Sequence, residues 1–148
     1  MYKSNLIDTL RENFFVFAFG GVVYSLTEIA YRGFTHWTMT LTGGFAFLML
    51  YVIDIRLPSA NIIIKSLVGC LVITLIEFFV GMVANKVFGL NIWDYSGKRF
   101  NLYGQVCPLF SCVWFLLCIP GVTICRLIRT TFFEYASGIK KNRGHEKS

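Results

Sequence analysis

The chain has 148 residues, of which 55% are hydrophobic and 15% are charged, and its formal net charge is +6. A soluble domain of this length has about 25% charged residues and no long uninterrupted apolar segments. The composition therefore excludes an ordinary soluble domain and predicts an integral protein of the lipid bilayer. Most Lys and Arg residues flank apolar segments or lie in the C-terminal tail, so the charge does not indicate a nucleic-acid partner.

Four apolar segments predict four transmembrane helices, at residues 14–31, 37–53, 62–84 and 107–125. At about 1.5 Å per residue, each helix is about long enough for a hydrocarbon layer of ~30 Å. Pro120 in the fourth segment is expected to kink the helix without breaking it, because neighbouring helices can satisfy the freed carbonyl. The predicted fold is all-α, a polytopic integral membrane protein with four transmembrane helices.

The distribution of Lys and Arg predicts the orientation. With four helices, both termini lie on the same side as the connection between the second and third helices. That side carries ten Lys and Arg residues, and the other side carries four. Cytoplasmic segments carry such an excess, so we predict a multi-pass cell-membrane protein with cytoplasmic termini (N-in/C-in). We expect residues 1–131 to form the four-helix transmembrane domain and 132–148 an amphipathic to disordered basic cytoplasmic tail.

Two glutamates lie inside predicted helices. Glu28 is one turn after Tyr24 in the first helix, and Glu77 is close to Thr74 in the third, at a similar depth. An ionised carboxylate in hydrocarbon costs about 2.5 kcal/mol or more, so such residues usually face a protein interior or a cavity. Each glutamate could support helix packing through a salt bridge, for which Arg32 is available to Glu28. Alternatively, the pair could bind a cation, carry a proton or orient an amine-bearing substrate.

Small and polar residues recur at helical spacing in the third and fourth helices, which predicts that one face of each helix packs inside the bundle. The two faces consist of Ser66, Cys70, Thr74, Glu77, Gly81 and Asn85, and of Ser111, Trp114, Cys118, Gly121 and Cys125. The five cysteines form no CxxC pair and show no zinc-site spacing. No nucleotide-binding or hydrolase motif is present. We therefore predict no catalytic residue, no metal and no cofactor, and any driving ATPase would be a separate chain.

The polar segment 91–105 separates the third and fourth helices. Trp93 and Tyr95 are expected to anchor at the membrane interface, as aromatic residues commonly do. Asp94 begins a predicted turn in which its carboxylate accepts backbone N–H bonds. Asn101 and Gln105 are four residues apart and would share a helix face if the fourth helix began early.

The stretch WDYSGKRFNLYGQVCPLFSCVW, together with TLIEFFVG upstream, resembles the putative ABC-transporter type IV membrane proteins, the CmpB-like family. The resemblance implies a multi-span membrane protein. It is specific over about residues 74–114 and weaker in the first two helices. The family often has an arginine where this chain has Gln105. The positions that match the family pattern are Glu28, Glu77, Trp93, Asp94, Tyr95, Asn101, Gly104 and Gln105.

Three functions remain open at this stage. We favour a transporter or transporter-like subunit, acting as a homo-oligomer or with a separate ATPase subunit. The alternatives are an accessory or regulatory protein that binds another membrane protein or lipid, and an intramembrane lipid-modifying enzyme that uses Glu28, Glu77 or Asp94. The candidate substrate-binding or structural polar residues are Glu28, Tyr24, Glu77, Thr74, Asp94, Trp93, Tyr95, Asn101 and Gln105.

Overall fold

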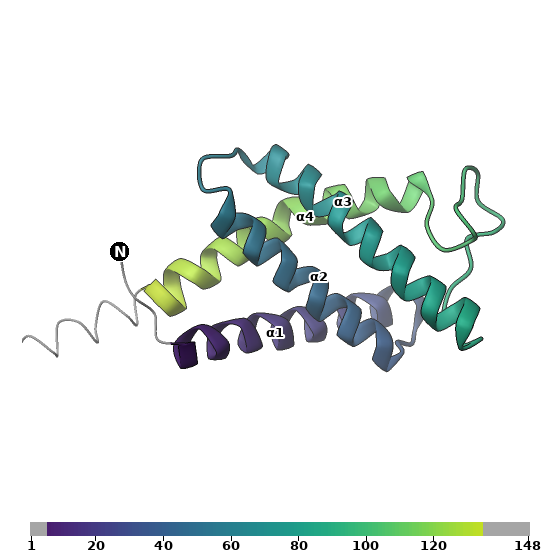
Figure 1. Cartoon of the computed structure of the whole chain (residues 1–148), viewed down its shortest axis with the longest axis horizontal. Coiled ribbons are helices and arrows are strands. Elements are labelled where there is room, and N and C mark those ends of the chain that lie inside the picture. Colours follow the sequence, from purple (N-terminus) through teal and green to yellow (C-terminus); the bar gives the residue numbers. More distant parts are fainter. Residues whose placement is uncertain (1–5, 135–148) are drawn as a thin grey trace, which may run out of the picture.

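The computed structural model describes residues 6–134, which form four long helices and two short π-helical continuations (Figure 1). The only strand-like feature of this part of the chain is an isolated bridge between Leu102 and Val106. The all-α prediction is therefore confirmed. The elements are α1 (Leu6–Arg32), α2 (Trp37–Arg56), α3 (Ile62–Gly81) with η1 (Met82–Val87), and α4 (Pro108–Ile128) with η2 (Arg129–Glu134).

All four helices are long and apolar enough to cross a membrane, which confirms the four predicted spans. Helix α1 is already present at Leu6, the first described residue, rather than starting at residue 14, because the mixed polar and apolar residues before the apolar segment continue the same helix. Pro120 lies inside α4 without ending it, as expected. The tail predicted for residues 132–148 lies almost entirely outside the described residues.

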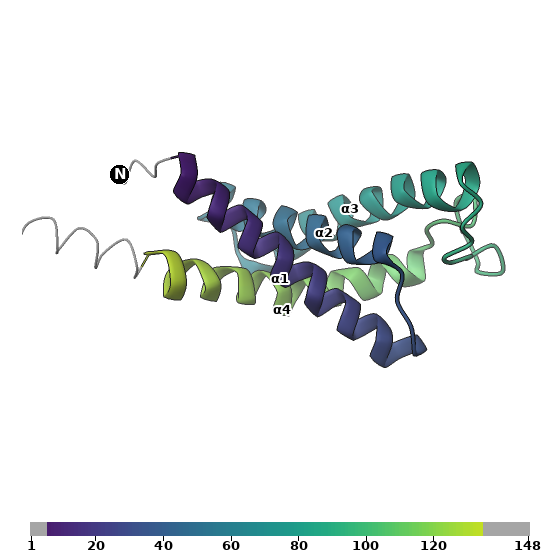
Figure 2. The same ribbon diagram turned by 90° about the horizontal axis from the view of Figure 1, so that it is seen from below.

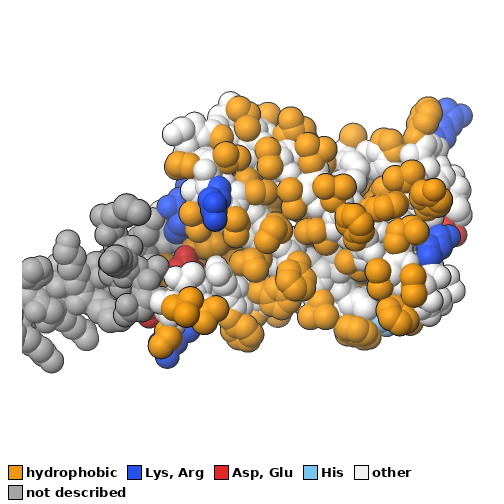
Figure 3. Space-filling view, viewed as in Figure 1, with side chains coloured by type: hydrophobic (Ala, Val, Ile, Leu, Met, Phe, Trp, Pro, Cys, Tyr) orange, Lys and Arg blue, Asp and Glu red, His pale blue; other side chains and the backbone are white. Residues whose placement is uncertain are grey.

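The two ends of the bundle hold different connections (Figures 1 and 2). The start of α1, the α2–α3 connection and the end of α4 lie at one end, which we call the inner end. The α1–α2 connection and the long segment 88–107 lie at the opposite, outer end. These names follow the predicted orientation, which stays a prediction. Hydrophobic side chains cover most of the face seen in Figure 3, and Lys and Arg gather towards the two ends.

The helix starts carry local signals that explain where they lie. His36 caps α2, because its side chain accepts from the backbone N–H of Thr38. Asn61 caps α3 in the same way, accepting from the N–H of Ile64 at 2.9 Å. Side-chain caps of this kind satisfy N–H groups that have no partner within the helix. Pro108 occupies the first position of α4, where a missing N–H carries no penalty.

Glycines let the helices approach closely, as small residues do in membrane bundles. On α2, a Cβ at Gly43 would overlap the ring of Tyr24, and one at Gly44 would lie 2.8 Å from the carbonyl oxygen of Phe17. Helix α1 contributes Gly20 and Gly21 to the same contact. This packing fixes the position of Tyr24 on α1 relative to α2.

The polar faces predicted for the third and fourth helices do lie inside the bundle. Of the third-helix set, Ser66, Cys70, Glu77, Gly81 and Asn85 are buried and Thr74 is half-buried. On α4, Cys118, Gly121 and Cys125 are buried, whereas Ser111 and Trp114 are half-buried. The five cysteines are free thiols. The main hydrophobic core between these faces consists of Val16, Leu50, Tyr51, Cys70, Ile73, Cys118, Val122, Cys125 and Ile128.

Candidate functional site: a buried carboxylate at the outer half of the bundle

Glu77 is held inside the bundle by two neutral hydrogen-bond donors. Its side chain projects from the buried face of α3, and the residue is 4% exposed. The Tyr95 hydroxyl donates to Oε1 at 3.1 Å, and the Trp114 indole N–H donates to Oε2 at 2.9 Å. None of the ion pairs formed within residues 6–134 includes Glu77. Both carboxyl oxygens therefore have partners, but neither partner carries a compensating charge.

A small cavity of about 10 Å³ lies beside Glu77, enough for about one water molecule. It shares several lining residues with a larger apolar cavity of about 180 Å³ among α1, α2 and α4. The rings of Tyr24 and Trp114 stack with their centroids 5.8 Å apart and line both cavities. The shared residues are Tyr24, Gly43, Ala46, Ile73 and Trp114. The buried carboxyl thus borders on a small cavity that shares part of its lining with the larger apolar cavity.

Glu28 lies in a different environment. Its Oε1 pairs with Arg32 at 2.5 Å, and its Oε2 accepts from the Thr35 hydroxyl at 2.5 Å. Arg32 also donates to the carbonyl of Ile92 at 3.0 Å, which ties the end of α1 to the outer segment. Of the two alternatives left open for Glu28, the structure thus contains the salt bridge to Arg32. Glu28 does not line the cavity beside Glu77.

Trp93 lies inside the protein, so the expectation that it anchors at the membrane interface is wrong. It is 9% exposed, and its indole N–H donates to the carbonyl of Gln105 at 3.0 Å. Asn85 on η1 closes this arrangement, accepting from the N–H of Ile92 at 2.7 Å and donating to Gln105 Oε1 at 2.9 Å. These buried hydrogen bonds draw the indole inward, and they fasten the outer segment to the end of the third helix.

Tyr95 is also turned inward rather than towards the interface. Its ring stacks on Phe110 with a centroid distance of 4.4 Å and an interplanar angle of 13°. Burial raises the pKa of the Tyr95 hydroxyl, and the neighbouring Glu77 carboxylate raises it further. The hydroxyl therefore keeps its proton at ordinary pH and can act as the donor to Glu77.

Asp94 forms the predicted turn. Its carboxylate accepts from the backbone N–H of Ser96 at 2.8 Å and from the Ser96 hydroxyl at 2.9 Å. The backbone bond is the larger cause that holds the pKa of Asp94 below its usual range, and the hydroxyl bond adds to it. Asn101 stabilises the same segment, donating to the carbonyls of Ser96 and Lys98 and accepting from the N–H of Gly104. Both side chains therefore shape the loop.

The fourth helix does not begin early, so Asn101 and Gln105 share no helix face. Phe100, Tyr103 and Gly104 have positive φ angles of 57°, 53° and 72°, which a right-handed helix cannot contain. Helix α4 starts only at Pro108. Gln105 is 1% exposed within the loop core, and Asn101 is half-buried.

Thr74 joins α3 to α4 through its hydroxyl, which lies 3.2 Å from that of Ser111. It neighbours Glu77 along the helix but makes no hydrogen bond with it among the described residues. Of the nine predicted positions, the structure brings together Glu77, Tyr95 and Tyr24. It places Glu28 in a separate ion pair, Thr74 at a helix contact, and Trp93, Asp94, Asn101 and Gln105 in the folding of the loop.

One residue of the Glu77 site and one ionic cluster were missed in the sequence. Trp114 was assigned only to helix packing, yet its N–H is a direct partner of Glu77. At the inner end, Asp54 and Lys65 are each 1% exposed and form an ion pair of 2.6 Å. Arg129 and Arg126 approach the same carboxylate at 3.1 and 3.5 Å. A signal for this cluster was present in the sequence. Asp54 and Lys65 carry opposite charges near the adjacent ends of the second and third helices, and Arg126 and Arg129 are three positions apart at the end of the fourth.

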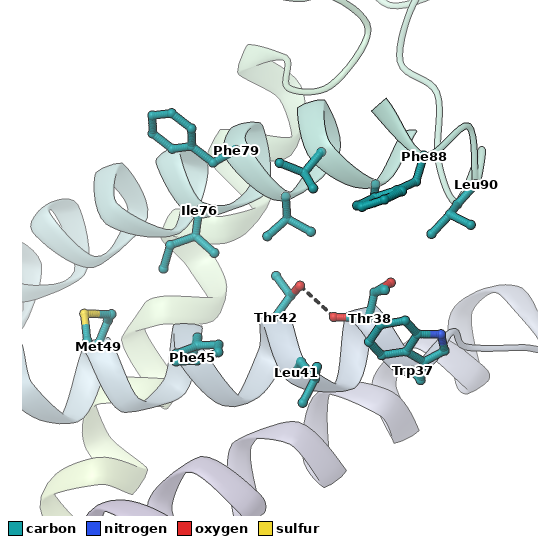
Figure 4. A pocket seen from close by; sticks show the side chains of 13 residues that line it. Trp37, Thr38, Leu41, Thr42, Phe45, Met49, Ile76, Phe79, Phe88 and Leu90 are labelled. Carbon is teal, nitrogen blue, oxygen red and sulfur yellow. Dashed lines mark hydrogen bonds between the residues drawn. The ribbon is translucent and has the colours of Figure 1, made fainter. Parts of the chain in front are cut away.

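A wide apolar groove of about 920 Å³ separates the outer halves of α2 and α3 (Figure 4). Its walls carry bulky side chains, including Phe45, Ile76 and Phe79, and Thr42 keeps its hydroxyl on the carbonyl of Thr38. The groove contains no glycine. The remaining lining residues are Trp37, Leu41, Met49, Val80, Val83, Ala84, Phe88 and Leu90.

The described residues contain no group of three or more His, Cys, Asp or Glu side chains that could hold a metal ion. The arrangement defines a class: a four-helix polytopic membrane protein with a buried, uncompensated carboxyl near its outer end. The sequence model of the family described as "Putative ABC-transporter type IV" matches residues 13–145, and the chain belongs to this family. The searches of curated proteins and of solved structures gave no match.

Proposed function

We propose that the chain is the membrane subunit of a transport system, and that Glu77 is its site for a proton or a small cation. The observation that carries this proposal is the pairing of Glu77 with two neutral donors and with no cation of the described chain. An ionised carboxylate at membrane depth costs at least about 2.5–3.5 kcal/mol, and such residues commonly mark ion or proton pathways. A bound proton or an external cation would remove this penalty.

The surroundings of Glu77 support uptake from the outer side. The carboxyl is connected to the outer segment through Tyr95, whose hydroxyl is its direct partner. The apolar cavity of about 180 Å³, which shares Tyr24 and Trp114 with the cavity beside Glu77, gives room for a solute. A site that exchanges a proton for a cation needs both features: a carboxyl protected from bulk water, and adjacent space.

Four helices form a narrow bundle, so we propose that transport needs either a homo-oligomer or a separate ATPase subunit. The family description supports an association with ABC transport. Native mass spectrometry of the tagged protein, extracted in mild detergent from its own host, reads subunit count and co-purifying chains together. A co-purifying ATPase would support the proposal that the chain is the membrane subunit of a transport system, and a monomer with no partner would contradict that proposal.

The role of Glu77 is tested by infrared spectroscopy of the full chain in nanodiscs, titrated with pH. The infrared band of the protonated Glu77 carboxyl is identified by its absence in Glu77→Gln. The intensity of this band should change with external pH in the wild type and in a Glu28→Gln control. A Glu77 band that does not change over the titration would identify a sealed structural carboxyl and refute the proposed site. Thermal stability provides a second readout. Glu28→Gln should lower it more than Glu77→Gln does, because the first variant breaks an ion pair and the second removes only an uncompensated carboxyl.

The groove between α2 and α3 favours a second candidate, an accessory protein that binds a lipid acyl chain. Close helix contacts in membranes need small residues, and those of α2 already face α1. The bulky walls of the groove suit a flexible chain better than a rigid helix. Retention of about one lipid per chain, reduced by Phe45→Ala and not by Phe132→Ala at an exposed site elsewhere, would support this reading.

A further inference from the structure

Glu77 lines a cavity of about 10 Å³, which has room for about one water molecule. Its carboxyl group accepts hydrogen bonds from the neutral Tyr95 hydroxyl and Trp114 indole, and none of the ion pairs within residues 6–134 includes it. A primary ammonium group is close to a water molecule in size, and its positive charge would balance the carboxylate. The cavity beside Glu77 therefore suits a primary ammonium group, and it is too small for a quaternary one.

A metal ion suits this position less well than an ammonium group. Calcium takes about six to eight oxygen ligands, and the described residues contain no group of three or more His, Cys, Asp or Glu side chains. Thr42, which also lines the small cavity, keeps its hydroxyl on the carbonyl of Thr38 at 2.7 Å. An ammonium ion needs fewer oxygen ligands, because aromatic rings also attract it. The rings of Tyr24 and Trp114 line the same cavity as Glu77.

The larger cavity of about 180 Å³ suits the hydrocarbon part of such a ligand. It shares Tyr24 and Trp114, whose ring centroids are 5.8 Å apart, with the cavity beside Glu77. None of its lining side chains is a Lys, Arg, His, Asp or Glu. A charged group buried there would have no counter-charge, whereas an alkyl chain would be stabilised by leaving water. The two cavities together match a ligand that is charged at one end and apolar at the other.

We propose that Glu77 and the two cavities bind a primary alkylamine, with its ammonium group against the Glu77 carboxylate and its alkyl chain in the larger cavity. This inference rests on the proposed function, since it names the class of cation that Glu77 receives. Tyr24 and Trp114 line both cavities, so the bound amine contacts both rings. Where the carboxyl is protonated, its proton leaves to water as the alkylammonium ion binds.

The test uses the full chain in nanodiscs of phosphatidylcholine, which carries no net charge. Butylammonium is added at the pH where the infrared band of the protonated Glu77 carboxyl has half of its maximal intensity. The band should weaken in the wild type and in Glu28→Gln, because a bound ammonium ion stabilises the ionised carboxylate. Tetramethylammonium should act about tenfold more weakly or less, because its head overfills the small cavity. Butanol, which has the same chain and no charge, should leave the band unchanged.

Ala46→Leu tests the position of the alkyl chain. Ala46 lines both cavities, and the longer side chain of leucine would fill space that the alkyl chain needs. Ala18→Leu is the matched control, because Ala18 is an exposed residue of α1 that lines neither cavity. We expect the half-effective concentration of butylammonium to rise about tenfold in Ala46→Leu and to stay within about twofold of the wild type in Ala18→Leu.

The outcomes distinguish a failed amine site from a failed proton site. A Glu77 band that responds to pH but not to butylammonium would overturn the amine site and leave the proton site standing. Equal effects of butylammonium, tetramethylammonium and butanol would also overturn it, since they would indicate a general effect on the bilayer. So would an unchanged response in Ala46→Leu, because the chain would then lie elsewhere. A band that responds to neither pH nor butylammonium would refute the proposed role of Glu77 itself.

Discussion

Neutralising Asp54 should destabilise the bundle more than neutralising any exposed carboxylate. In Asp54→Asn the side chain keeps its size but loses its charge, and Lys65, which is 1% exposed, is left without its counter-charge. Breaking a buried ion pair by removing one partner costs about 3–5 kcal/mol. The contribution of Arg126 and Arg129 is smaller, because both side chains can turn to solvent.

This loss corresponds to a fall in the unfolding midpoint on the order of 10 °C, taking about 2–4 °C per kcal/mol for a chain of this size. The midpoint is measured in detergent by tryptophan fluorescence at one fixed scan rate. Asp54→Asn is compared with Asp94→Asn, in which the altered carboxylate is exposed and bonds only to Ser96. We expect the control to unfold within a few degrees of the wild type.

A double variant tests the physical cause. Asp54→Asn combined with Lys65→Met removes both buried charges and keeps a side chain of similar length, so it should recover more than half of the lost stability. A midpoint for Asp54→Asn within about 2 °C of the wild type would refute the reasoning. A double variant less stable than Asp54→Asn alone would refute the assignment of the loss to the unpaired lysine.

Three further predictions concern the packing and the outer segment. Gly43→Ala should lower the unfolding midpoint, because a Cβ there overlaps Tyr24, whereas Gly97→Ala should not, because nothing lies within 4 Å of the added atom. Gln105→Leu leaves a buried amide donor unpaired and should cost about 1–3 kcal/mol, seen as faster proteolysis of the outer segment. The Asp94 turn should persist at neutral pH and weaken only as pH falls through its lowered pKa, because protonation removes the charged acceptor. The amide resonance of Ser96 should shift as the turn weakens, and this pH-dependent shift should be absent in Asp94→Asn.

The four helices were predictable because apolar length determines membrane spans independently of tertiary contacts. The inward faces of the third and fourth helices were also predictable, since small and polar residues at helical spacing have few alternatives in a bilayer. The extension of α1 to Leu6 was not, because polar residues outside the hydrocarbon layer carry no hydropathy signal.

The partners of the polar residues were less predictable because they depend on contacts between distant segments. The bond between Trp114 and Glu77 joins residues 37 positions apart, and hydropathy gives no information on it. Trp93 carried the composition of an interfacial anchor, but the acceptor at Gln105 is available only once the loop has folded. Only the Glu28–Arg32 pair and the Asp94 turn, whose partners lie within four residues, could be predicted from spacing.

The buried carboxylates of the membrane-spanning helices differ in how their charge is balanced. Asp54 has Lys65 at 2.6 Å and Glu28 has Arg32 at 2.5 Å, so a structural role accounts for both. Glu77 is as deeply buried but receives only neutral donors. A purely structural acceptor could have been a neutral side chain without the penalty of a carboxylate. On this ground we propose that the charge of Glu77 is balanced from outside the chain, by a proton or by a cation.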